Sequence, residues 1–323
     1  MDHSFKIKSI ILMVLLMTSL LRSQAAGISG GPNAFYKLPL TAREISLGGA
    51  GIAISRGPFS AFWNPALIVD TEHRNSVGIN INWSSNEILL SDKLLIGGLS
   101  HQYKDEPIFF SALWMHKKVE GIINTELPYD EIEITGGESG LTENLLIMTL
   151  AGKFRSGSAG FSWRPSTSRL DKITWSSWKN LDIGFLVSED KYDYGFVIKL
   201  DSDSLNTDLS FGTGGVIKLP LGENQVNATA DLKGGQNNFP EFAVGGEYEK
   251  DKVQIRGGMN FGFPNGKFDL NQMQQRFVSI GGSIQVETIS VDLSWTIPVS
   301  SSDIGEYMRF VDIPLKLSLI WRK

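Results

Sequence analysis

The sequence contains no cysteine, few histidines and no long basic run. With no Cys and four His among 323 residues, the chain can form no disulfide, thiolate metal site or lipid-modified cysteine. The net charge of −5 argues against nucleic-acid binding, which relies on Lys and Arg to neutralise phosphates. Hydrophobic residues make up 41% and charged residues 20% of the chain, which is typical of a folded protein.

Motifs for catalysis and cofactor binding are also missing. Neither HExxH nor GxSxG occurs, and the segment 262–267 (GFPNGK) is too short for a phosphate loop and lacks the Ser or Thr after Lys. His101 and His116 lie on a predicted hairpin in which His101 pairs near Phe110, so the two rings are not cross-strand neighbours. We therefore expect a non-enzymatic protein with no cofactor and no metal.

The N-terminus has the features of an export signal. A basic start precedes the apolar run Ile10–Leu21, which is too short to span a bilayer comfortably as a helix. Small residues at Ser23–Ala25 predict cleavage after Ala25. We therefore expect a signal peptide over residues 1–25.

From Val77 onward, apolar and polar residues alternate with a period of two, which predicts strands rather than helices. Leu186 and Ile320 break this alternation. About fourteen strands are predicted, near 76–84, 94–103, 107–120, 144–154, 158–169, 175–188, 192–201, 210–220, 224–234, 241–250, 253–262, 276–286, 289–299 and 311–322.

Short and long connections alternate between these strands, a pattern typical of up-and-down outer-membrane barrels. An even number of strands places both termini at the short-turn end, which is periplasmic in such barrels. A soluble sandwich or lipocalin-like barrel has the same alternation, but a ring of fourteen strands encloses a space too wide for its own side chains to fill. We predict an all-β, about 14-stranded antiparallel transmembrane β-barrel with an N-terminal luminal plug.

Mid-strand charges support a polar lumen. A charge on a lipid-facing position costs roughly 2–4 kcal/mol at mid-bilayer, and every mid-strand charge that we can place falls on the polar face of its strand. These charges are Asp182, Lys199, Asp231, Lys233, Glu247, Arg256, Asp292 and Lys316. Because acidic and basic groups balance, we expect a cross-linked interior rather than an ion-selective pore.

The segment Asn33–Asp70, before the predicted barrel, differs from the rest of the chain. It begins with Phe35, Leu38, Pro39 and Ala42-Arg43. Its main motif comprises Gly48, Gly49 and Gly51, followed by Phe62, Trp63, Asn64, Pro65 and Ala66. In these features the segment resembles the start of the PorV/PorQ family and of the related FadL-type transporters. The resemblance implies a fourteen-stranded outer-membrane barrel whose N-terminal segment enters the lumen as a plug. We therefore expect a signal peptide (1–25), an N-terminal plug segment (26–75) and an outer-membrane β-barrel (76–323).

The motif residues suit a plug on physical grounds. Glycine permits positive φ and close approach of the backbone to a wall, and Pro65 favours an extended conformation at Asn64. The Asn64 amide can satisfy nearby backbone groups. Two readings stay open: a tightly packed turn with no ligand contact, and a direct role in gating or ligand binding.

Three functions remain open at this stage. The PorV/PorQ resemblance implies a component of type IX secretion, with secretion proteins or exported cargo as partners. The FadL resemblance implies a channel for hydrophobic small molecules as the alternative. A soluble exported binding barrel is the third. The first two place the protein in the outer membrane of a Gram-negative-type bacterium, with lipid around the barrel and no nucleic-acid partner.

Overall fold

A computed structural model describes residues 41–69, 73–85, 91–104, 106–126, 133–170, 173–202, 207–235, 240–263, 274–298 and 315–323. The predicted signal peptide and the residues Phe35, Leu38 and Pro39 lie outside these ranges. The described residues contain three short helices, α2 (Ala42–Ser46), η2 (Ser60–Phe62) and η3 (Pro65–Ile68). No described helix is long and apolar enough to cross a membrane.

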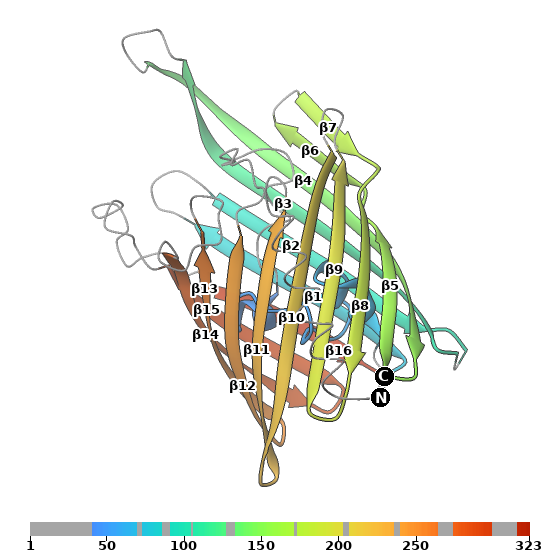
Figure 1. Cartoon of the computed structure of the whole chain (residues 1–323). Helices are drawn as coiled ribbons and strands as arrows, with labels where there is room; N and C mark the ends of the chain where they lie inside the picture. The colour runs from blue at the N-terminus through green and yellow to red at the C-terminus, as the bar shows by residue number, and fades with distance from the viewer. Residues whose placement is uncertain are drawn as a thin grey trace.

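The strands form one closed antiparallel β-barrel of fourteen strands (Figure 1), two of which are interrupted so that they count as four of the sixteen labelled segments. This confirms the predicted fold. Each strand is hydrogen-bonded to the next around the ring, except that β4 pairs with both β5 and β6 and that β5 pairs with β8. The first strand, β1, pairs with the last, β16, and closes the barrel. The strands are β1 (Asn75–Ser85), β2 (Ser91–Gln102), β3 (Ile108–Glu126), β4 (Glu133–Phe154), β5 (Gly157–Trp163), β6 (Ser166–Leu170), β7 (Ile173–Ser177), β8 (Leu181–Ser188), β9 (Tyr192–Ser202), β10 (Thr207–Leu221), β11 (Asn224–Gly235), β12 (Glu241–Lys250), β13 (Val253–Gly262), β14 (Gln274–Val286), β15 (Ile289–Pro298) and β16 (Leu315–Arg322).

Two strands predicted as continuous are each divided in two. The predicted strand 158–169 is interrupted at Arg164-Pro165, between β5 and β6, and its partner 175–188 is interrupted between β7 and β8. Proline has no N–H to donate to a neighbouring strand, although the Pro165 carbonyl still accepts from the Leu146 N–H at 3.0 Å. The β6–β7 hairpin therefore continues the wall from β4 with a local irregularity.

The strands β3 and β4 are longer than predicted. The stretch 121–143, which was predicted to be a loop, is largely strand on both sides of its tip. Strands of 19 and 22 residues exceed the 9–11 that a tilted strand needs to cross a membrane, and the hairpin projects beyond the barrel at the long-loop end (Figure 1). At the other end the predicted register is confirmed, since His101 pairs with Phe110.

The outer surface of the barrel is apolar. Ile79, Ile183 and Ile280 are 49%, 46% and 51% exposed, whereas the polar residues between them face inward and are buried. A soluble barrel with an apolar interior would have the opposite arrangement. The exposed belt is the surface that lipid covers in a transmembrane barrel.

The two residues that break the alternation, Leu186 and Ile320, point into the lumen. They are 8% and 6% exposed and belong to the same buried apolar cluster as the plug residues Phe59 and Trp63. An apolar side chain on the polar face of a strand therefore marks a position where the wall packs against the plug.

We predict that an arginine on the outer belt destabilises the barrel according to its depth. Ile79→Arg, near the middle of β1, should cost about 2–4 kcal/mol, and Val77→Arg, close to the short-turn end, about 0–1 kcal/mol. Urea unfolding in phospholipid vesicles measures both. Equal and small costs at the two positions would indicate that the belt faces water.

Candidate functional site

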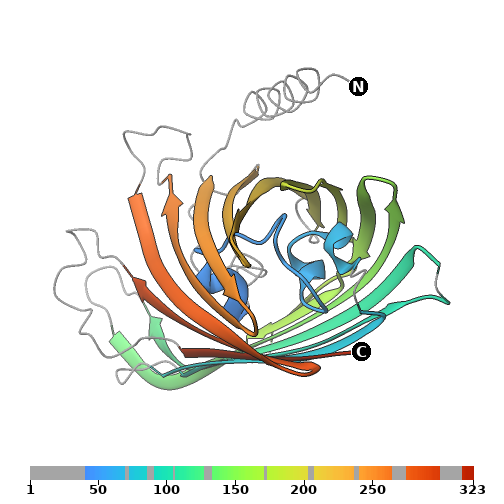
Figure 2. The same ribbon diagram turned by 90° about the horizontal axis from the view of Figure 1, so that it is seen from below.

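The candidate site is the lumen, which the N-terminal segment fills. The described part of this segment, residues 41–69, is called the plug here. Its helices α2, η2 and η3 lie inside the ring of strands (Figure 2). Helix α2 packs against β13–β16, whereas η3 packs against β3, β4, β5 and β8, so the two ends of the plug contact different sectors of the wall.

Glycines on both partners let the plug backbone touch the wall backbone. Gly48 and Gly49 have φ of +72° and +87°, a region that side-chain-bearing residues rarely adopt. A Cβ on Gly48 would lie 2.3 Å from the Met259 carbonyl oxygen, and one on Gly258 would lie 2.1 Å from the Gly48 nitrogen. Neither glycine can be replaced without moving the two backbones apart.

The second half of the motif forms a capped turn. Asn64 is extended (φ −156°, ψ 118°), as Pro65 favours, and its Oδ1 accepts the Ala66 N–H at 3.0 Å to cap η3. Its Nδ2 donates to the carbonyls of Ile52 in the plug and Phe185 in the wall, both at 3.0 Å. Asn64 is fully buried and thus joins two parts of the plug to β8.

The aromatic pair of the motif packs against the rest of the plug and beneath two lysines. A Cβ on Gly51 would lie 2.5 Å from the Trp63 ring, so Trp63 needs a glycine there. Lys233 Nζ lies 4.3 Å from the Trp63 ring centroid and Lys199 Nζ lies 4.8 Å from that of Phe62, within the range of cation–π attraction.

Three of the predicted luminal charges bind the plug backbone directly. The Asp231 carboxylate accepts the N–H groups of Gly51 and Ile52 at 2.7 and 2.9 Å. Lys233 donates to the Gly49 carbonyl at 2.6 Å, and Lys199 donates to the Phe62 carbonyl at 2.7 Å. Irregular backbone inside a barrel needs such partners, because an unpaired buried N–H or C=O is costly.

Three further predicted charges join in one buried network. Arg256 donates to Glu247 at 2.6 Å and to Asp292 at 2.7 Å, and it links β12, β13 and β15. Arg43 of the plug reaches the same Glu247 at 2.9 Å. Removing one member of such a buried network leaves an uncompensated charge and typically costs about 3–5 kcal/mol, so the network fastens α2 to the wall.

The remaining predicted charges lie elsewhere on the inner face. Asp182 is fully buried beside Arg164, at 2.8 Å, and Arg164 also pairs with Asp201 at 2.7 Å. Lys316 is half-buried on the inner side of β16, opposite Asn82 and Ser294. The sequence patterns did not single out Arg164, although it sits at the interruption before Pro165.

One sector of the lumen is apolar, which the sequence analysis missed. Inward positions of β2, β3 and β4 carry buried apolar side chains that cluster with Phe62, Trp63, Leu67 and Ile68 of the plug. We call this sector the apolar inner wall; it comprises Leu94, Ile96, Phe109, Leu113, Met115, Leu145 and Ile147. The sequence does contain a feature that indicates this wall, because an apolar run such as Leu94–Ile96 places apolar side chains on both faces of its strand.

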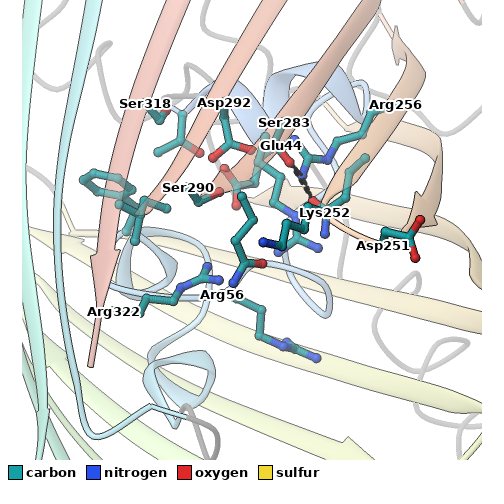
Figure 3. Close-up of a pocket in the computed structure, with 16 residues that line it drawn as sticks. Glu44, Arg56, Asp251, Lys252, Arg256, Ser283, Ser290, Asp292, Ser318 and Arg322 are labelled. Carbon is teal, nitrogen blue, oxygen red and sulfur yellow. Dashed lines mark hydrogen bonds and ion pairs between the residues drawn. The ribbon is translucent and has the colours of Figure 1, made fainter. Parts of the chain in front are cut away.

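Two cavities adjoin the plug at the short-turn end. The first, between α2 and β13–β16, encloses about 40 Å³, room for a few waters at most. Acidic and basic side chains surround it, including Glu44, Asp292, Lys252 and Arg322 (Figure 3). The second measures about 360 Å³ and has Val69, Leu186 and Phe154 among its lining residues, together with Arg155 and Lys153. The second is large enough for a small organic ligand.

Glu44 is a buried acid in the plug. Burial raises the pKa of its carboxyl above the ordinary value, against the lowering effects of a 2.5 Å hydrogen bond from Ser55 and of neighbouring Arg43. Glu44 Oε2 has no hydrogen-bond partner in the described part of the chain. Burial therefore disfavours the charged form of this carboxyl.

We predict that Asp231→Ala frees the plug backbone at the motif. Loss of the carboxylate leaves the Gly51 and Ile52 N–H groups unpaired, at about 1–3 kcal/mol each, so these amides should exchange hydrogen at least about tenfold faster. Mass-spectrometric hydrogen exchange on the detergent-solubilised barrel measures this change. The control is Thr229→Ala on the same strand, whose hydroxyl has no partner among the described residues. Unchanged exchange in Asp231→Ala would contradict the assignment.

We predict that Glu44 makes the plug more stable in acid. Its folded-state pKa is raised, so the folded protein binds the proton more tightly than the unfolded chain does. The corresponding stability is lost as the pH rises through the folded-state value. Hydrogen exchange of α2 should quicken as the pH is raised, after correction for intrinsic rates. Glu44→Gln should flatten this dependence, and a pH profile identical to that of the wild type would refute the role of Glu44.

Comparisons with known proteins find similarity in structure alone. No family model matches the sequence, and no curated protein matches it. Three similar solved structures are a deletion mutant of the TodX monoaromatic hydrocarbon channel, the toluene transporter TodX of Pseudomonas putida and a FadL homologue of Pseudomonas aeruginosa. Their TM-scores are 0.65, 0.57 and 0.54 at 11%, 10% and 12% identity.

These similarities extend over nearly the whole of each molecule. They cover 88%, 92% and 88% of this chain and 99%, 98% and 99% of the three relatives, in the same order. At such low identity the agreement concerns the fold. The chain therefore has the fold of FadL-type outer-membrane channels.

Proposed function

We propose that this protein is an outer-membrane channel for hydrophobic small molecules. The observation that carries the proposal is the apolar inner wall, in which Ile96, Met115 and Ile147 are fully buried against neighbours inside the lumen. A barrel lumen that passes only water and ions needs no such surface, since porin interiors are polar. A molecule without hydrogen-bonding groups could move along it without leaving polar groups unpaired.

The plug and the larger cavity define the rest of a path for a hydrophobic molecule through the barrel. In the structure, Leu67 and Ile68 of η3 pack in the cluster with the apolar inner wall. Val69, directly after η3, and Leu186 of β8 line the 360 Å³ cavity at the short-turn end. We place this end in the periplasm, as the short-turn rule for outer-membrane barrels implies. The route would then run down the apolar inner wall, past η3 and into this cavity.

The named relatives support a channel rather than a secretion component. Two are described as a hydrocarbon channel and a toluene transporter, which favours the FadL-type alternative. The type IX secretion role, predicted from the resemblance of residues 33–70, receives no support from the solved structures. We therefore expect a deletion strain to retain normal secretion and surface display of type IX cargo.

We predict that the barrel speeds entry of toluene into whole cells. The assay compares radiolabelled toluene uptake by cells that express the barrel or an empty vector. Intact cells are needed because a simple phospholipid bilayer is itself permeable to toluene. Ile147→Gln should lower the added uptake about tenfold, since the buried amide would lack a partner at roughly 1.4 kcal/mol or more.

The matched control is Thr229→Gln, an inward and buried position on the opposite, polar side of the lumen. It should leave uptake within about twofold of the wild type. Heat-modifiable migration on gels checks that each variant forms a barrel. Equal uptake with and without the wild-type barrel would reject the channel function.

A further inference from the structure

A row of basic side chains crosses the outer face of the barrel toward the long-loop end. Lys93 of β2 lies directly opposite Lys118 of β3. On β4, Thr142 lies opposite both Lys118 and Arg169 of β6. The side chains of Lys93 and Lys118 are 56% and 47% exposed, and Arg169 is also exposed. We call Lys93, Lys118 and Arg169 the basic row.

The basic row shares its face of the sheet with the apolar outer belt. Along β3, Phe110, Trp114 and Lys118 are four positions apart and therefore point to the same side. Phe110 and Trp114 are 45% and 43% exposed. On β2, Leu95 is 39% exposed and lies two positions from Lys93 on the same side. The outer face thus changes from apolar to basic within a few residues.

The basic row lies about one membrane thickness from the short turns. Lys118 comes about ten residues after Ile108, the first residue of β3, and Lys93 comes about ten residues before the end of β2. A tilted strand needs about 9–11 residues to cross a membrane. Trp114, just below the row, stacks on His116 with 5.8 Å between ring centroids, and aromatic residues are enriched at the membrane–water boundary. With the short-turn end in the periplasm, this boundary belongs to the outer leaflet.

The basic row belongs to one sector of the barrel. Other strands are apolar or carry alanine along the outward face, as β11 and β15 show. The outward residues are Val226, Ala228, Ala230 and Leu232 on β11, and Ile289, Val291, Leu293, Trp295 and Ile297 on β15. In the sector of the basic row, β3 and β4 also continue beyond the barrel as the projecting hairpin (Figure 1). A molecule held at the row would therefore have protein beside it above the membrane surface.

The arrangement of charges in the row favours an anion. Like charges directly opposite each other on neighbouring strands destabilise a sheet, and Lys93 faces Lys118 in this way. The described carboxylate beside both lysines is that of Glu120, which pairs with Lys118 and lies 3.8 Å from Lys93. Exposed ion pairs of this kind contribute little to stability. An anion that contacts both lysines would offset their repulsion.

We propose that the basic row binds the phosphate groups of a phosphorylated lipid in the outer leaflet, with the acyl chains of that lipid against the apolar belt. Lys and Arg bind phosphate through charge-assisted hydrogen bonds, and Arg can form two at once. A free phosphate ion would contact the row alone, whereas a lipid also covers Leu95 and Trp114 beneath it. The site lies outside the lumen, so this inference is independent of what the channel carries; it uses only the orientation of the barrel given above.

Native mass spectrometry of the detergent-solubilised barrel tests the proposal, with lipid A, a diphosphorylated glycolipid, as the probe. Since each Lys or Arg at a membrane surface adds attraction for anionic lipid, the triple variant Lys93→Gln, Lys118→Gln, Arg169→Gln should bind lipid A at least about tenfold more weakly than the wild type. Equal binding by the triple variant and the wild type overturns the proposal.

The matched control removes the same charge at the other end of the barrel. It is the triple variant Lys104→Gln, Lys191→Gln, Lys250→Gln, in which three exposed lysines at short turns are replaced. It should bind lipid A within about twofold of the wild type. A loss equal to that of the basic-row variant would show that only the net charge matters, and this result also overturns the proposal.

Two further measurements separate a lipid phosphate from other anions. Lipid A from which both phosphates have been removed should bind the wild type at least about tenfold more weakly, and a tenfold excess of inorganic phosphate should not displace lipid A. Glu120→Gln should tighten lipid A binding about two- to threefold, because it removes a carboxylate that competes for both lysines. Equal binding of the dephosphorylated lipid, or displacement of lipid A by inorganic phosphate, contradicts the assignment.

Discussion

The fold depends on the fit of an irregular backbone against the inner wall of a barrel that is too wide to fill itself. Fourteen strands enclose more space than their own side chains occupy, so a further segment can enter the lumen, and it has to satisfy its polar groups there. The pairing of Gly48 with Gly258 brings the backbones into contact, and Asp231 then accepts two plug N–H groups. Because of this fit, several of the luminal charges lie within hydrogen-bonding distance of the plug.

The inner surface of the barrel has two sides of different polarity. Opposite the charged strands β11–β15, the inward faces of β2–β4 carry mainly apolar side chains, with polar residues such as Ser111 and Thr149 among them, and they pack against aromatic and aliphatic plug residues. Asn64, between them, contacts both another part of the plug and β8. A lumen with one charged and one mainly apolar side can hold its plug by charge and still offer a hydrophobic molecule an apolar surface.

The barrel could be predicted from sequence because strand periodicity is local. Alternation placed the strands, the inward charges and the register of His101 with Phe110, and it marked Leu186 and Ile320 as exceptions. The partners of these groups could not be predicted: Arg43 and Glu247 lie 204 positions apart, and only closure of the ring brings them together. The apolar inner wall does not follow from alternation, because Leu94–Ile96 and Leu145–Met148 are apolar on both faces of their strands.

The central claim is that the apolar inner wall is the binding surface for hydrophobic molecules. The most direct measurement is a crystal structure of the barrel soaked with bromobenzene, in which anomalous scattering locates the bromine. The account predicts a bromine inside the lumen beside Met115 and Ile147. Bromine found only on the outer belt would contradict it.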